Sequence, residues 1–141
     1  MKFMENVNQR FDICVASGIL YHMTEPARFL ELCAKTSDKI FIWTHYADDD
    51  VIKNHTGLSQ KIKSVDATEY KDYKYNEYYY EYDSALGWAG FCGGSNPFCK
   101  WITKSAMIQI LKLNGFNKVE IFFDDLSNHP AGPNICFLAE R

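Results

Sequence analysis

The segment 11–44 constrains the fold most, because it holds two short apolar runs with a helical pattern between them. Residues 11–17 form an apolar run without alternation, which predicts a strand buried on both faces. A helix follows, with Thr24 as its cap and Pro26 in its first turn. A second buried strand is predicted over residues 39–44. Strand, helix and strand within about 35 residues predict a right-handed βαβ unit with two parallel strands.

The C-terminal part predicts one helix and two further strands. Thr103 is positioned to cap the helix, and Gly115 fits the left-handed position that follows a helix end. Residues 118–124 and 135–139 are apolar runs joined by a short turn-rich connector, so we expect two antiparallel strands. The main elements are therefore four strands and two helices, and the fold class is α/β.

The stretch 48–100 has the pattern of an insertion that is first tyrosine-rich and then glycine-rich. Seven of the nine tyrosines lie between Tyr70 and Tyr82, in a pattern that fits either a short hairpin or one irregular aromatic strand. Residues 87–97 have the composition of a loop. The acidic run 48–50 fits a solvated loop or a helix start better than a metal site, so no metal is predicted.

Composition excludes several classes of protein. The formal net charge is −3 and no basic block occurs, so nucleic acid is an unlikely partner. No apolar run of about 18 residues exists, so no membrane association is expected. The N-terminus lacks the pattern of a signal peptide. The five cysteines are odd in number and form no CxxC pair, which favours a reduced, cytoplasmic protein.

Three segments together resemble a known family. FDICVASGILYHMTEPARFL resembles the region around the fourth strand of class I S-adenosylmethionine-dependent methyltransferases. WITKSAMIQILKLNGFNKVEIFFDD resembles the late helix, Gly-Phe turn and sixth strand of that family, and ICFLAER resembles its final antiparallel strand. The resemblance implies a truncated Rossmann-like methyltransferase sheet of about four main strands, formed by one domain over residues 1–141, with 48–100 inserted in it.

The family's glycine-rich cofactor loop and first three strands have no counterpart in this sequence. Gly93 and Gly94 lie too late in the chain to form that loop. The resemblance therefore covers only the C-terminal half of the family's domain. It implies S-adenosylmethionine as cofactor, but most of the groups that bind it belong to the missing half. The alternative is that the isolated chain binds no cofactor.

The missing strands leave an open edge on the predicted sheet. In the family's strand order, the strand 12–17 would lie next to the absent first strand. A hydrophobic edge with unpaired backbone groups pairs readily with another chain. We therefore expect a homodimer or higher oligomer through the 12–17 edge, or pairing with a separate N-terminal half.

The corner after the first predicted strand is the candidate cofactor and catalytic region. Ligands of open α/β sheets bind beyond the carboxyl ends of the strands. There, Ser17, Gly18 and Leu20 are candidate cofactor contacts, and His22 is the candidate catalytic residue, as a base or an orienting group. The alternative is that Tyr21 and His22 only cap the strand.

The candidate substrate-binding residues are Tyr21, His45, Tyr46, Trp88 and Trp101. His45 and Tyr46 follow the second strand and fit either the same pocket or a solvated loop. The two tryptophans flank the glycine-rich loop and fit either a lid or a loop held by aromatic burial. The implied function is methyl transfer from S-adenosylmethionine to a small molecule or other nucleophile. The alternative is a non-catalytic oligomeric binding module descended from a methyltransferase.

Overall fold

The structure is a computed structural model, and it describes residues 1–91, 93–126 and 131–141. Cys92 and residues 127–130, which include His129 of the predicted connector, lie outside the described part. The helices are α1 (Lys2–Asn6), η1 (Leu20–His22), α2 (Pro26–Thr36), α3 (Asp49–Asn54), α4 (Thr56–Lys61), η2 (Asp83–Gly87) and α5 (Lys104–Leu113). The strands are β1 (Cys14–Ser17), β2 (Lys39–His45), β3 (Ile62–Tyr70), β4 (Tyr73–Glu81), β5 (Phe98–Ile102), β6 (Lys118–Asp125) and β7 (Asn134–Glu140).

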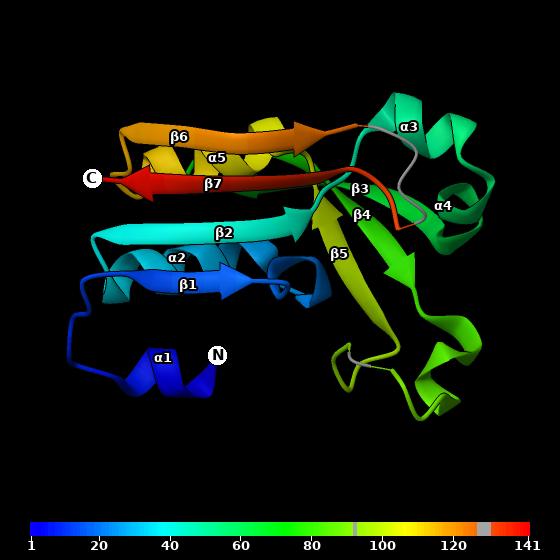
Figure 1. Cartoon of the computed structure of the whole chain (residues 1–141), viewed down its shortest axis with the longest axis horizontal. Coiled ribbons are helices and arrows are strands. Elements are labelled where there is room, and N and C mark those ends of the chain that lie inside the picture. Colours follow the sequence, from blue (N-terminus) through cyan, green and yellow to red (C-terminus); the bar gives the residue numbers. More distant parts are fainter. Residues whose placement is uncertain (92, 127–130) are drawn as a thin grey trace.

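The main sheet contains four strands in the order β1-β2-β7-β6. β1 and β2 are parallel, whereas β7 pairs antiparallel with both β2 and β6. Helices α2 and α5 lie behind this sheet in the view of Figure 1, and they pack against each other. The α/β class, the βαβ unit and the antiparallel final pair expected from the sequence are therefore confirmed.

Among the described residues, helices cover one face of the main sheet and leave the other uncovered. Ala16, Ile40 and Phe137 alternate with outward-facing neighbours and are at most 1% exposed. On β1 the neighbouring Val15 is 64% exposed, and Phe122 on β6 is 52% exposed. The expectation that residues 11–17 are buried on both faces is therefore wrong. An apolar run is buried on both faces only when elements cover both, and here helices cover one.

The inserted segment forms most of a second, antiparallel sheet in the order β3-β4-β5. Of the two alternatives for the tyrosine-rich stretch, the structure has the hairpin. Lys71 and Asp72 form its two-residue turn, with φ of 49° and 65°, as expected for the tight turns that match strand twist. β5 was not predicted. The described residues therefore hold seven strands rather than four.

The helix termini agree only in part with the prediction. The hydroxyl of Thr103 accepts a 3.1 Å hydrogen bond from the backbone N–H of Ala106, which confirms it as the cap of α5. Gly115 has φ of +92°, and the N–H of Phe116 donates to the carbonyl of Leu111, which closes the helix end as expected. The cap of α2 was predicted wrongly. Its N-cap is Glu25 rather than Thr24, and no side chain caps it.

Candidate active site

The two parallel strands end side by side, and this places the candidate site. Ser17 pairs with Trp43, and the N–H of Gly18 donates a 2.9 Å hydrogen bond to the carbonyl of Trp43. Gly18 has φ of +70°, and a Cβ there would lie 3.4 Å from the Trp43 ring. The corner needs glycine for its backbone conformation. It turns the chain so that η1 lies beside the end of β2.

An enclosed pocket lies at this end, between the main sheet and the second sheet. Its volume is about 130 Å³, and it is more enclosed than four larger hollows on the protein surface. We call it the aromatic–imidazole pocket; it is lined by Tyr21, His22, His45, Tyr80, Tyr82, Cys99, Trp101 and Ala131. The pocket therefore combines residues from η1, β2, β4 and β5.

One wall of the aromatic–imidazole pocket is a stack of three rings. The Tyr80 and Trp101 rings lie 4.9 Å apart at 9°, and the Trp101 and His45 rings lie 5.8 Å apart at 10°. Tyr21 meets His45 edge-on at 4.9 Å, and its carbonyl accepts a 3.1 Å hydrogen bond from Nε1 of Trp101. Stacked and edge-to-face rings each contribute about 0.5–1.5 kcal/mol beyond their burial. These contacts therefore hold the rings of the wall in position.

His22 also lines the pocket, and it is hydrogen-bonded to Tyr82. A 2.8 Å hydrogen bond joins Nδ1 of His22 and the hydroxyl of Tyr82. Tyr82 and Cys99 both line the pocket. Burial raises the pKa of the Cys99 thiol to about 11, so this sulfur stays protonated and is no nucleophile at neutral pH.

The protonation of the two imidazoles follows from their surroundings. Nδ1 of His45 lies 3.2 Å from the carbonyl oxygen of Gly132 and 3.1 Å from that of Pro133. Both oxygens accept, so Nδ1 of His45 carries a proton. Burial, and then the nearby His45, lowers the pKa of His22. The His22 imidazole is therefore neutral at pH 7, the state in which histidine accepts a proton.

Two polar atoms in the pocket lining have no hydrogen-bond partner among the residues that the structure describes. They are Nε2 of His22 and the hydroxyl oxygen of Tyr80. No deeply buried side-chain nitrogen or oxygen in the described part lacks a partner, so both atoms remain open to solvent. The lining residues include no Asp, Glu, Lys or Arg. The site therefore offers two polar contacts in an uncharged aromatic setting.

The structure brings together four residues singled out from the sequence. Tyr21, His22, His45 and Trp101 all line the aromatic–imidazole pocket. This is the shared pocket that was one alternative for His45, because parallel strands put their carboxyl ends at the same edge. Whether these residues bind or act on a substrate stays a prediction.

Three other residues predicted from the sequence to contact cofactor or substrate lie outside the aromatic–imidazole pocket. Leu20 is 2% exposed and belongs to the hydrophobic core, where an apolar side chain beside α2 is buried. The buried Tyr46 donates a 2.7 Å hydrogen bond to Oδ1 of Asp124, outside the pocket. Trp88 is 68% exposed and does not line the pocket.

The positions of Ser17 and Gly18 show whether the corner after β1 could hold a cofactor. Ser17 is exposed, and neither residue lines the aromatic–imidazole pocket or any of the four larger hollows. The residues of this corner therefore do not form a cofactor cradle by themselves. The described part of the chain also holds no cluster of three or more side chains suited to a metal ion, and none of its helices is long and apolar enough to cross a membrane.

Sequence reasoning missed Tyr80, Tyr82 and Cys99 as pocket residues. Their signal was the alternation of tyrosines, which puts Tyr78, Tyr80 and Tyr82 on one side of an extended segment. The sequence contained no sign of which sheet that side would face. Cys99 lies on β5, which was not predicted.

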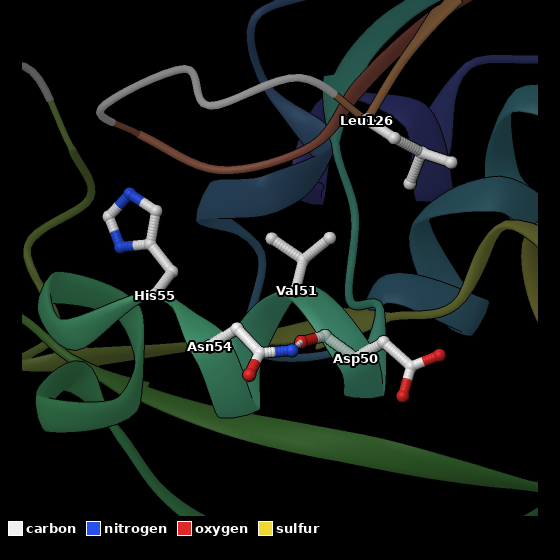
Figure 2. A pocket seen from close by; sticks show the side chains of 5 residues that line it. All are labelled: Asp50, Val51, Asn54, His55 and Leu126. Carbon is white, nitrogen blue, oxygen red and sulfur yellow. Dashed lines mark hydrogen bonds between the residues drawn. The ribbon is translucent and has the colours of Figure 1, made fainter.

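Figure 2 shows a second hollow, of about 280 Å³, over α3. Val51 and Leu126 lie on opposite sides of it, and the carboxylate of Asp50 points away. Nδ1 of His55 accepts a 3.2 Å hydrogen bond from the N–H of Leu58 and caps α4. The polar groups here serve helix ends, so this hollow is a weaker candidate than the aromatic–imidazole pocket.

No protein-family model matches this sequence, and no curated protein matches it. Among solved structures, the N-terminal domain of EvdMO1 with SAH bound has a TM-score of 0.64 and 20% identity, over 97% of this chain and 50% of that chain. The same domain in the presence of SAH and D-fucose also gives 0.64, over 52% of that chain. Magnesium protoporphyrin IX methyltransferase from Synechocystis PCC 6803 with bound SAH has a TM-score of 0.49 and 15% identity, over 98% of this chain and 48% of that chain. This TM-score is too low to support a shared fold. The chain thus spans about half the length of the EvdMO1 domain and shares its fold, which confirms the expected truncated α/β sheet.

Proposed function

We propose that this chain is the acceptor-binding part of an S-adenosylmethionine-dependent methyltransferase that acts on a small molecule. The observation that carries the proposal is the aromatic–imidazole pocket at the joint carboxyl end of β1 and β2. Ligands of open α/β sheets bind at such ends. The solved domain that shares this fold was crystallised with SAH, which supports the choice of cofactor.

In this proposal His22 is the catalytic base. Its lowered pKa keeps the ring neutral, and Nε2 remains open to solvent beside the pocket. It would take the proton from the nucleophilic atom of the acceptor. S-adenosylmethionine supplies an electrophilic methyl group when it is bound. The aromatic wall positions the acceptor, which is the main demand of methyl transfer.

The cofactor-binding groups lie outside residues 1–141 in this proposal. The edge of β1 has no neighbouring strand among the described elements, and the uncovered sheet face carries exposed apolar side chains such as Val15 and Phe122. A second copy of the chain or a separate N-terminal half would pair with the β1 edge and cover this face. The four described cysteines are free thiols, which suits the reduced cytoplasm that we propose as location.

A second candidate function is a non-catalytic binding module. It is favoured by one observation, that Ser17 and Gly18 line neither the aromatic–imidazole pocket nor the four larger hollows. Such a module would keep the pocket and the uncovered face but lack a cofactor.

Calorimetric titration of S-adenosylhomocysteine, with the mass of the same sample measured by light scattering, separates the two functions. The methyltransferase proposal predicts micromolar binding only to an assembly. Binding to a monomer would refute the need for a second polypeptide. A well-folded oligomer that binds no S-adenosylhomocysteine would favour the binding module.

A further inference from the structure

We propose that the aromatic–imidazole pocket binds a small uncharged ring with a single hydroxyl group, a simple phenol, whose hydroxyl bonds with His22 and Tyr80. The binding itself is argued from the pocket alone. That the bound hydroxyl receives a methyl group rests on the proposed function.

The size and shape of the pocket point to one ring. Its volume is about 130 Å³, close to the roughly 150 Å³ of a protein cavity that holds benzene. The stack of Tyr80, Trp101 and His45 lines the pocket with aromatic rings, whose neighbouring planes are 9° and 10° from parallel. A planar ligand ring packs against aromatic side chains in an offset or edge-on arrangement.

The electrostatics of the lining exclude a charged ligand. None of the eight lining residues is Asp, Glu, Lys or Arg, and the pKa of His22 is lowered by burial, so its ring is neutral. An ionised ligand would lose its hydration without gaining an opposite charge. A carboxylate or an ammonium group on the ring would therefore prevent binding.

The number of available polar atoms selects a ring with one hydroxyl rather than a sugar. Within the described part of the chain, Nε2 of His22 and the hydroxyl of Tyr80 have no partner, and both residues belong to the lining. One hydroxyl is satisfied by donating to a nitrogen and accepting from a second hydroxyl. A sugar carries several hydroxyls, and two contacts leave most of them unpaired, which costs binding free energy.

The hydrogen bond between His22 and Tyr82 sets the tautomer of His22 in this proposal. The Tyr82 hydroxyl accepts from Nδ1–H of His22 across the 2.8 Å contact between them. Nε2 of His22 then carries the lone pair that accepts the ligand hydroxyl. The opposite tautomer has a proton on Nε2 and offers a donor instead.

Calorimetric titration of phenol and toluene into the folded chain tests the proposal, because toluene has nearly the same shape but no hydroxyl. We expect phenol to bind with a Kd of about 1 mM or tighter, and at least about tenfold more tightly than toluene. Benzoate and D-fucose should bind more weakly than phenol. Equal binding of phenol and toluene, or tighter binding of D-fucose, would overturn the inference.

Two variants and one NMR spectrum test where the hydroxyl of phenol binds in the pocket. Tyr80→Phe keeps the stacked ring and removes only the hydroxyl, so it should weaken phenol binding about tenfold and leave toluene binding unchanged. His22→Ala should do the same or more, whereas the exposed Trp88→Ala should change neither. ¹⁵N NMR should find His22 protonated at Nδ1 and not at Nε2. Unchanged phenol binding in both pocket variants would refute the inference, as would a proton on Nε2.

S-adenosylhomocysteine titrated into the same sample keeps the two proposals separate. Phenol binding without S-adenosylhomocysteine binding in any assembly supports this inference and contradicts the methyltransferase proposal. The reverse result leaves the methyltransferase proposal standing and refutes the substrate class.

Discussion

The ring of His45 stacks on the ring of Trp101, with centroids 5.8 Å apart and planes 10° from parallel. His45 ends β2 of the main sheet, and Trp101 lies on β5 of the second sheet. The contact joins the two sheets at the aromatic–imidazole pocket. The geometry of the site therefore depends on the relative position of the two sheets and on the residues that hold each of them.

Gly18→Ala should destabilise the fold by about 1–2 kcal/mol, because alanine resists the left-handed conformation at φ of +70°. Its added Cβ would also meet the Trp43 ring at 3.4 Å. Urea unfolding followed by circular dichroism measures the loss. Gly87→Ala is the matched control, since a Cβ there meets nothing within 4 Å. Equal effects of the two substitutions would show that the corner has no special backbone requirement.

The stability of the chain should fall as the pH is lowered, in part through His22. Burial and the neighbouring His45 lower the pKa of His22 in the folded state. Below the ordinary histidine pKa of about 6.5, the unfolded chain therefore takes up the proton first. The contribution of neutral His22 is fully present above that pH and is lost as the pH falls through the folded pKa.

Urea unfolding at pH 7.5 and pH 5.5 checks this dependence. The loss of unfolding free energy between the two pH values should be smaller in His22→Gln, which cannot take up the proton. An identical loss in both proteins would mean that the folded and unfolded pKa values of His22 are equal.

Val15→Glu should lower the mass of the chain measured by light scattering at micromolar concentration. Val15 is 64% exposed on the edge strand β1, and a charge in a strand edge discourages pairing with another chain. Val65→Glu is the control, because Val65 is 49% exposed on β3 of the other sheet. If the unmodified chain is already a monomer, the proposed self-association through β1 is wrong.

Lys100→Met should destabilise the fold by about 2 kcal/mol. Nζ of Lys100 donates a 2.6 Å hydrogen bond to the buried carboxylate of Glu77, which would lose its counter-charge. Removing one partner of a fully buried pair costs roughly 3–5 kcal/mol, and the partial exposure of Lys100 reduces that figure.

The exposed Lys39→Met is the matched control for that pair. Lys118 also contacts Glu140, the partner of Lys39, and the pair is exposed, so the loss should be smaller than at Lys100. Denaturant unfolding of both variants compares them. A loss at Lys100 no larger than the loss at Lys39 would contradict a stabilising role of the buried pair.

Local signals predicted the parts of the fold that depend on neighbouring residues. Thr103 and Gly115 were predicted as helix ends because caps are set by contacts within one turn. Parallel pairing of β1 and β2 followed from the strand–helix–strand order, and with it the meeting of Tyr21 and His45 in one pocket.

The rest depended on packing between distant segments. The exposure of Val15 is set by what covers the sheet, which an apolar run does not reveal. The place of Tyr80 depends on the β4–β5 pairing and on the docking of that sheet against β2. Alternating tyrosines predict which side chains share one face of a strand, but not which element packs against that face. The part of the pocket formed by Tyr80 could therefore not be predicted from the sequence.

The hairpin formed by β3 and β4 is held at both ends. Near its turn, the hydroxyl of Tyr70 donates to the side-chain oxygen of Asn114 after α5, while at its other end Tyr80 lies in the pocket wall. The corner that holds His22 and His45 belongs to the main sheet and does not include the hairpin. Exchange of residues 62–81 for another hairpin would therefore alter the shape of the pocket while leaving the backbone of the corner in place. The choice of ligand would then be set by a replaceable hairpin, separately from the sheet that holds the corner.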